Sequence, residues 1–340
     1  DIPAENIEEL SKFALKKNID LTIVGPEVPL VKGITNKFQS LGLNCFGPTE
    51  DAARLEGSKE FMKNFLTRNQ IPTAAYQSFN DLKLALEYLE KCSFPIVVKA
   101  DGLAAGKGVT VAQTHSEAEK AVRECLEEKT FGEAGTKVVV EEFLRGEEAS
   151  FIVLTDGHTI LPLASSQDHK TRDNQDKGPN TGGMGAYSPA PVVTPEIHQK
   201  IMDQVINPTL TGLAKEGMNY CGFLYAGLMI DQEQNVKVLE FNCRFGDPET
   251  QPVLMRLRSD LVDLCYQASK GKLKAIDLEW DPRVALGVVM AAGGYPNYYE
   301  KGHPIKGLPP ESKTVKVFHA GTQAKDNLII SNGGRVLCVT

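Results

Sequence analysis

The stretch VVKADGLAAGKGV at residues 97–109 places a glycine-rich loop directly after a short apolar run. A P-loop would read G-x-x-x-x-G-K-[ST], but here Gly102 and Gly106 are one residue too close together, and Lys107 is followed by Gly108. The three glycines also miss the G-x-G-x-x-G spacing of dinucleotide-binding folds. Residues 97–109 therefore predict a phosphate loop of another kind, and taken alone they leave an ordinary turn as an equal alternative.

The composition of the whole chain is that of an ordinary globular protein. Its 340 residues are 41% hydrophobic and 24% charged, enough for about two or three domains with buried cores. No apolar run approaches the roughly 20 residues of a membrane span, and the acidic N-terminus DIPAENIEEL does not have the pattern of an export signal. We therefore expect a cytoplasmic protein without membrane contact.

Charge and metal-ligating residues exclude other classes of function. The net charge of −7 argues against a nucleic-acid-binding protein, which would carry a basic face, although local lysines can still bind a small anion. The seven cysteines contain no C-x-x-C pair, and the six histidines show no zinc spacing. Reduced thiols in a cytosolic protein fit this pattern better than disulfides or a zinc site.

Hydrophobic periodicity predicts alternating strands and helices in the first 70 residues. We expect strands at 20–25 and 43–47, an amphipathic helix over 28–42, and a helix over 59–70 capped by Ser58. The glycine-rich strand–loop–helix unit that normally opens such a sheet does not precede them. The first fifty residues therefore predict a partial N-terminal α/β domain.

The rest of the chain mixes strands and helices around one long polar stretch. The predicted elements are helices over 80–92 and 116–128, a strand at 137–143, an antiparallel pair that turns at Asp156-Gly157, a helix from Thr194, strands at 222–231 and 236–244, a helix after Pro248 and a strand-rich end. The Gly/Pro/Asn-rich stretch of residues 168–191 is longer than most structureless loops, so we expect a functional loop there.

The most informative stretch is VKVLEFNCRFGDPE at residues 236–249. Glu240 and Asn242 are two residues apart, so they lie on the same face of a strand. Carboxylate and carbonyl oxygens are ligands that Mg²⁺ prefers, with waters and substrate phosphates completing its shell. The structural alternative is a strand-end carboxylate paired with Arg244, or a pair between Arg244 and Asp247. So many polar groups at one strand end favour a metal-binding function.

A second polar cluster surrounds the turn at Gly146 in VVVEEFLRGEEAS, residues 138–150. Backbone groups beside the apolar Phe143 and Leu144 can hydrogen-bond the edge of a flat base, and the Glu148 carboxylate can hold two ribose hydroxyls. Glu141 belongs to the same cluster. An acidic hairpin turn is the alternative that this stretch leaves open.

In combination these motifs resemble the ATP-grasp superfamily, and within it the glycinamide ribonucleotide synthetases (phosphoribosylamine–glycine ligases) of purine biosynthesis. The resemblance runs over the whole chain and rests on VGPEVPLVKG, EGSKEFMK, VVKADGLAAGKGV, EEFLRGEEASF, QDHK, GPNTGGMGAYSPAP and EFNCRFGDPETQ. It implies a mixed α/β and α+β chain. An ATP-grasp domain at residues 51–270 would lie between a partial N-terminal domain at 1–50 and a partial, strand-rich C-terminal domain at 271–340.

The resemblance also implies how ATP and a divalent metal bind. The loop at residues 101–108 becomes a mobile flap over the triphosphate, and Glu240 and Asn242 hold Mg²⁺ or Mn²⁺. Many relatives place a third carboxylate one strand earlier, where this chain has Gly227, so we expect two protein ligands to the metal. The implied nucleotide-binding residues are Lys59 and Lys99 for phosphate, Gly102, Gly106, Lys107 and Gly108 in the flap, Glu141, Phe143 and Leu144 for adenine, and Glu148 for ribose.

The resemblance assigns the remaining motifs to the two other substrates, glycine and 5-phosphoribosylamine. Catalytic candidates are Asp168, Lys170, Arg244 and Asp247, and substrate-binding candidates are Gly25, Pro26, Glu27, Asn180, Gly182 and Gly183. Residues 25–27 follow a predicted strand, at the edge where α/β sheets bind ligands. A turn-stabilising role is the alternative for each of these positions.

The implied reaction joins glycine to 5-phosphoribosylamine through glycyl phosphate, with ATP as phosphoryl donor. A site of lysines, metal ligands and amides without an obvious nucleophile suits such phosphoryl transfer. The alternatives are a nucleotide-binding fragment without activity and a related ATP-grasp enzyme of the same pathway. We expect a monomer that acts on small molecules and binds neither nucleic acid nor membrane.

Overall fold

The computed structural model describes residues 2–104, 108–175, 177–310 and 312–340, which pack into two compact units. Unit 1 comprises residues 1–162, 192–245 and 260–277. Unit 2 comprises residues 163–191, 246–259 and 278–340. Within the described ranges, the helices are all too short or too polar to cross a membrane.

Unit 1 begins with short helices and a two-stranded parallel sheet. In chain order the elements are α1 (Ile7–Lys17), β1 (Thr22–Ile23), α2 (Glu27–Val31), α3 (Ile34–Ser40), β2 (Cys45–Phe46), α4 (Glu50–Gly57) and α5 (Lys59–Arg68). Ser58 caps α5 as predicted, because its hydroxyl accepts a hydrogen bond from Phe61 N at 3.1 Å. The single helix predicted over 28–42 is wrong. Gly33 adopts a left-handed φ of +78°, which separates α2 from α3.

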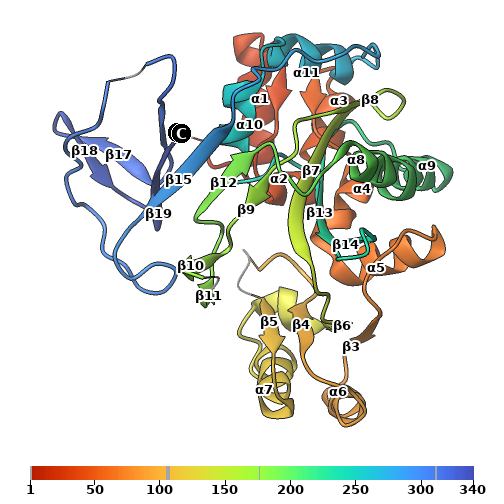
Figure 1. Ribbon diagram of the computed structural model, residues 1–340. Coiled ribbons are helices and arrows are strands. Elements are labelled where there is room, and N and C mark those ends of the chain that lie inside the picture. The colour runs from red at the N-terminus through yellow and green to blue at the C-terminus, as the bar shows by residue number, and fades with distance from the viewer. Residues whose placement is uncertain (1, 105–107, 176, 311) are drawn as a thin grey trace. The chain divides into compact units, whose positions relative to one another are not determined.

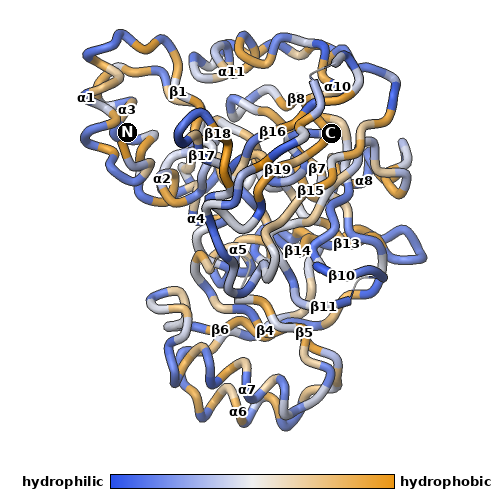
Figure 2. The backbone as a smooth tube through the Cα atoms, turned by 90° about the vertical axis from the view of Figure 1, so that its left-hand side faces the viewer, coloured by the Kyte–Doolittle hydropathy of each residue, from blue (hydrophilic) through white to orange (hydrophobic). Residues whose placement is uncertain are grey.

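A second part of unit 1 is an antiparallel sheet in the order β3–β6–β4–β5. Its elements are β3 (Tyr76–Phe79), α6 (Leu82–Leu89), β4 (Ile96–Ala100), β5 (Val109–Ala112), α7 (His115–Leu126), a 3₁₀ helix at Gly132–Thr136, and β6 (Val138–Glu142). Along α6 and α7, hydrophobic orange segments alternate with hydrophilic blue ones (Figure 2), and the hydrophobic residues pack on the sheet. The glycine-rich loop joins β4 to β5, so the apolar run before it is a strand, as predicted.

The larger sheet of unit 1 is antiparallel in the order β14–β13–β7–β8, with long neighbouring strands β7 and β13 (Figure 1). Its strands are β7 (Glu147–Thr155), β8 (Ile160–Pro162), β13 (Gly222–Ile230) and β14 (Val236–Asn242). The predicted turn at Asp156-Gly157 is confirmed, since β7 pairs with β8. The remaining helices are α8 (Pro195–Ile201), a π-helical turn at Met202–Ile206, α9 (Asn207–Lys215) and α11 (Leu261–Ser269).

Strand β14 contains a β-bulge next to the predicted metal ligands. Gly227 of β13 pairs with Glu240, but the next residue, Leu228, pairs with Val238, which leaves Leu239 as the extra residue. The Leu239 carbonyl accepts a hydrogen bond from Lys99 Nζ at 3.3 Å. The bulge therefore links β14 to a lysine on the other sheet of unit 1.

Unit 2 is built on an antiparallel sheet in the order β16–β19–β15–β12–β9. Its elements are β9 (Gln167–Asp168), β10 (Thr171–Asp173), β11 (Lys177–Asn180), β12 (Gly185–Ser188), α10 (Thr250–Arg256), β15 (Ala285–Ala291), β16 (Val317–His319), β17 (Thr322–Lys325), β18 (Leu328–Ser331) and β19 (Arg335–Val339). The long loop expected at 168–191 instead contains short strands. The strands of this stretch are too short to show hydrophobic periodicity in the sequence. They form through tertiary pairing, since β12 pairs with both β9 and β15.

Candidate functional site

Polar side chains from several elements of unit 1 line one small cleft. Glu240 and Asn242 come from the end of β14, Lys59 from the start of α5, Glu56 from the end of α4, and Arg244 from the residues after β14. The cleft has a volume of about 100 Å³. The described residues that line it are Glu27, Leu55, Glu56, Lys59, Met62, Leu103, Ala104, Gly108, Val109, Glu240, Phe241, Asn242 and Arg244.

Lys59 brings a half-buried positive charge to this cleft. Its Nζ donates to Gly102 O at 3.2 Å, and its backbone N donates to Asp101 O at 3.0 Å, so helix α5 holds the start of the glycine-rich loop. Burial lowers the pKa of Lys59, and the nearby Glu240 carboxylate opposes this effect. A partly desolvated ammonium group of this kind attracts phosphate oxygens strongly.

Small residues in the glycine-rich loop allow it to pack closely. A Cβ atom on Gly102 would lie 2.8 Å from Ala134 Cα, and one on Gly108 would lie 2.8 Å from Ala104 Cβ. The predicted flap residues Gly106 and Lys107 lie outside the described residues.

Glu56 is a buried acid of the cleft that contacts two consecutive residues, Cys243 and Arg244. Its side chain is only 6% exposed, its Oε2 accepts from Cys243 N at 2.7 Å, and its Oε1 lies 3.0 Å from Arg244 Nη2. Burial raises the pKa of Glu56 to about 7, and the Arg244 charge opposes this rise. Arg244 also lies 3.5 Å from Glu27 Oε2, so the arginine is held between two acids.

The donor atoms of the cleft suit a hard divalent cation. Glu240 and Asn242 line it together, as the two-residue spacing predicted, and they offer a carboxylate and an amide oxygen. Among the described residues, no three His, Cys, Asp or Glu side chains gather in a way that would enclose a metal. A cation here would take its remaining ligands from phosphates and waters, as Mg²⁺ commonly does.

A buried cluster of three charges lies beside the cleft. Lys99 Nζ is 3.0 Å and Lys63 Nζ is 2.9 Å from the same atom, Glu141 Oε2, and all three side chains are almost fully buried. Lys63 also donates to Thr73 Oγ1 at 2.8 Å. Burial lowers the pKa of Lys63 to about 8, which the Glu141 charge opposes. The other carboxylate oxygen of Glu141, Oε1, is buried and has no hydrogen-bond partner among the described atoms.

The other nucleotide-binding candidates flank this cluster along the chain. Leu144 is buried, Phe143 is half-buried with the Arg145 guanidinium 5.7 Å from its ring centre, and Glu148 is exposed near the start of β7. Gly25 and Pro26 precede α2, and Glu27 begins that helix. The structure thus gathers Glu27, Lys59, Gly108, Glu240, Asn242 and Arg244 in the cleft.

In unit 2, Arg335 joins three of the predicted site residues, Gly182, Asp247 and, through a longer hydrogen bond of 3.4 Å from its Nη1, the carbonyl of Gly183. Its Nη1 donates to Gly182 O at 2.6 Å and to Asp247 O at 3.1 Å, and its Nη2 donates to Asp247 Oδ2 at 2.9 Å. Gly183 has a φ of +109°, and a Cβ there would lie 2.3 Å from Pro248 Cδ, so only glycine fits. Asp168 and Lys170 form a pair at 3.8 Å, and Asn180 is exposed on β11.

Replacing Arg335 by lysine should destabilise unit 2, because one ammonium group cannot reproduce the fork that reaches Gly182 and Asp247. The expected loss is about 1–2 kcal/mol, measured by urea denaturation of the full chain. Arg283→Lys is the matched control, since the Arg283 side chain bonds the neighbouring Asp281 and is 57% exposed. Equal midpoints for the two variants would contradict this role of Arg335.

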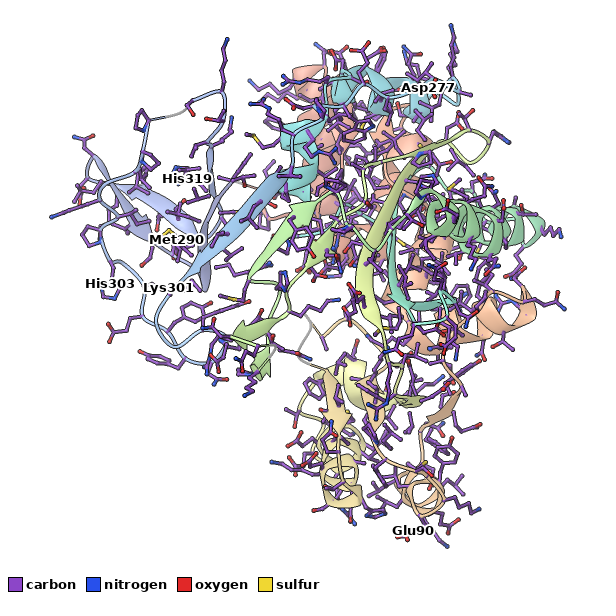
Figure 3. The ribbon with its side chains drawn as sticks, viewed as in Figure 1. Glu90, Asp277, Met290, Lys301, His303 and His319 are labelled. Carbon is purple, nitrogen blue, oxygen red and sulfur yellow. The ribbon has the colours of Figure 1, made fainter. Side chains whose placement is uncertain are left out.

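Unit 2 also contains a hollow of about 590 Å³ that the sequence did not predict. Met290 and His303, both labelled in Figure 3, belong to its lining, together with Tyr298, Tyr299 and Leu337. None of the predicted site residues that the structure describes lines this hollow.

Two residues of the site were missed by sequence reasoning. Glu56 begins the motif EGSKEFMK but has no signal of its own there, and Arg335 lies in none of the motifs. Their partners lie 187 and 188 residues away for Glu56 and 88 to 153 residues away for Arg335, so no local pattern points to them.

The fold and site of unit 1 define an ATP-grasp protein. Two antiparallel sheets, one carrying Lys99 and the other carrying Glu240 and Asn242, are the core of that class, which uses ATP with a divalent metal. A biotin carboxylase domain from Hydrogenobacter thermophilus, solved with ADP, magnesium and bicarbonate, has the same fold at a TM-score of 0.77. It covers 98% of this chain and 73% of its own at 17% identity.

Family models match almost the whole chain. They describe the N domain, the ATP-grasp (A) domain and the C domain of phosphoribosylglycinamide synthetase, at residues 1–56, 57–250 and 285–340. The chain belongs to the phosphoribosylglycinamide synthetase family.

Individual relatives agree with this assignment. A phosphoribosylamine–glycine ligase of Vibrio vulnificus is 61% identical over 341 residues, which is 100% of this chain and 80% of the relative. One from Escherichia coli is 60% identical over 342 residues, covering 79% of its length. The crystal structure of the Thermotoga maritima ligase matches 96% of this chain and 80% of its own, with a TM-score of 0.84 at 34% identity.

Proposed function

We propose that this chain ligates glycine to 5-phosphoribosylamine with the conversion of ATP to ADP and phosphate, giving glycinamide ribonucleotide. The observation that carries the proposal is the cleft in which Lys59, Glu240, Asn242 and Arg244 meet. Relatives named phosphoribosylamine–glycine ligase, about 60% identical over the full chain, support it.

The reaction needs a carboxylate to become a good electrophile. A glycine carboxylate oxygen attacks the γ-phosphorus of ATP, and the bond to the bridging oxygen breaks, which yields glycyl phosphate and ADP. The amine of 5-phosphoribosylamine then attacks the acyl carbon, and the acyl–oxygen bond breaks. The amine proton and the phosphate group leave together as inorganic phosphate.

The residues of the cleft would act by position and charge rather than as nucleophiles. Lys59 and Lys99 would hold phosphate oxygens, and Arg244, held between Glu27 and Glu56, would orient the glycine carboxylate. Glu240 and Asn242 would hold Mg²⁺ or Mn²⁺. When bound, such a cation neutralises phosphate charge as the negative charge shifts towards ADP.

The proposal also covers the other substrates, the adenosine part of ATP and the organisation of the chain. Asp168, Lys170, Asn180, Gly182, Gly183 and Asp247 would contact glycine or 5-phosphoribosylamine, and Gly25, Pro26 and Glu27 would contact the sugar. Glu141, Phe143 and Leu144 would bind adenine and Glu148 the ribose. We also propose a cytoplasmic monomer, with an ATP-grasp domain at residues 51–270 between flanking domains at 1–50 and 271–340.

The test is the substrate dependence of ADP release. We expect ADP formation that requires glycine and 5-phosphoribosylamine together, with one glycinamide ribonucleotide formed per ADP. ADP release that depends on a different acceptor would indicate a related ATP-grasp enzyme. Nucleotide binding without turnover under any acceptor would indicate a fragment that keeps the fold but not the reaction.

A further inference from the structure

The amide of Asn242 has two possible orientations, and its neighbours decide between them. With its NH₂ group directed at Glu56, it donates to Glu56 Oε1 at 3.0 Å and to Phe241 O at 3.2 Å. The reverse orientation would place the amide oxygen against two acceptors. The favoured orientation directs the nitrogen of Asn242 at Glu56 and its oxygen away from that carboxylate, and Asn242 lines the cleft.

The Glu56 carboxylate accepts from several donors, because both of its oxygens are acceptors. Oε2 takes the Cys243 backbone N–H, while Oε1 takes the Asn242 amide and the Arg244 guanidinium. Three consecutive residues after Phe241 are thus tied to one carboxylate from the end of α4.

We propose that Glu56 is a positioning residue that turns the Asn242 amide oxygen towards the divalent cation. This inference rests on the proposed function, since it requires a cation held by Glu240 and Asn242. Partners of metal ligands commonly fix the orientation of the ligand in this way, and their loss typically weakens metal binding about 10- to 100-fold.

The substitution Glu56→Gln tests the proposal with almost no change of shape. A glutamine side chain has one acceptor and one donor group, so its NH₂ group must face one set of donors. The backbone N–H of Cys243 cannot turn away, whereas the Asn242 amide can turn over and Arg244 keeps its second acid, Glu27. We therefore expect Asn242 to turn over and to present its NH₂ group to the cation, which should weaken cation binding about tenfold or more.

The double substitution Glu56→Gln with Asn242→Asp should restore binding. An aspartate at 242 accepts from the NH₂ group of the introduced glutamine with one oxygen and offers the other to the cation, and the net charge equals that of the parent. Such recovery would show that positions 56 and 242 act through one hydrogen-bond network, because a second change at an independent position would not compensate for the first.

The measurement is the affinity for Mn²⁺, followed by its EPR signal, for the full chain with ADP at pH 8. Glu216→Gln is the matched control, because Glu216 also pairs with an arginine, Arg68 at 2.7 Å, but does not line the cleft. We expect parent-like affinity for the control, weak binding for Glu56→Gln and recovery of most of the loss in the double variant.

Two results would overturn the inference. One is a Glu56→Gln chain that binds Mn²⁺ as tightly as the parent, and the other is a double variant that binds no better than Glu56→Gln. If Glu56→Gln does not fold, Asn242 still decides the question through the double variant, which is expected to fold and bind. A parent chain that binds no Mn²⁺ with ADP would instead refute the metal site of the proposed function, and this inference with it.

Discussion

Glu240→Ala is expected to lower kcat by about 100-fold or more, which is several kcal/mol of lost charge stabilisation. Glu240 lines the cleft together with Asn242 and acts on the half-buried charge of Lys59. Alanine keeps the strand backbone of β14 and its pairing with Gly227. The rate should therefore fall while the unfolding midpoint changes little.

The measurement is kcat at saturating ATP, glycine and 5-phosphoribosylamine over a range of Mg²⁺ concentrations. Glu233→Ala, in the exposed turn between β13 and β14, is the control and should retain parent-like turnover. A Glu240→Ala chain with near-normal turnover and an unchanged Mg²⁺ requirement would remove Glu240 from the site.

Glu141→Ala should have the largest effect on stability, about 3–5 kcal/mol, because it leaves Lys63 and Lys99 buried without their shared carboxylate. The free energy of unfolding, from urea denaturation, is the quantity to compare. Glu142→Ala is the control on the neighbouring residue. Glu142 is exposed and pairs with Lys237 at 3.5 Å, so its loss should cost less than about 1 kcal/mol.

A second substitution tells whether charge or packing causes that loss. Lys63→Met added to Glu141→Ala removes one of the two unpaired charges and should regain part of the stability. If Glu141→Ala is as stable as Glu142→Ala, the three buried side chains are not coupled as their distances indicate. If Lys63→Met brings no recovery, the loss comes from the cavity left by Glu141.

Local signals explain which elements could be predicted. Ser58 and Thr194 cap helices through their own hydroxyls three residues before the bonded N–H, so the sequence alone locates those helix starts. The break at Gly33 was missed because glycine within an amphipathic pattern is compatible with one continuous helix. In the structure Gly33 adopts a left-handed φ of +78°, which ends α2 and which other residues rarely adopt.

The candidate site residues divide in the same way, into those that a local pattern predicts and those that it does not. Glu240 and Asn242 could be placed on one face because alternation is a property of the strand itself. Glu56 and Arg335 could not be found, since each acts on residues far along the chain. The pairing of Lys99 with Glu141 depends on the register of β4 against β6, which sequence patterns do not specify.

The bulge at Leu239 decides which side of the sheet carries the polar pair of β14. Val236 and Val238 are buried, and unbroken alternation would send Glu240 and Asn242 into the same core. The extra residue shifts the phase by one, so Phe241 takes the next core position and the even-numbered side chains change sides. Strand β14 should therefore tolerate a substitution at position 239 better than a change in the number of its residues. Leu239 can change identity, but its deletion would remove the bulge and with it the carbonyl that accepts from Lys99 Nζ.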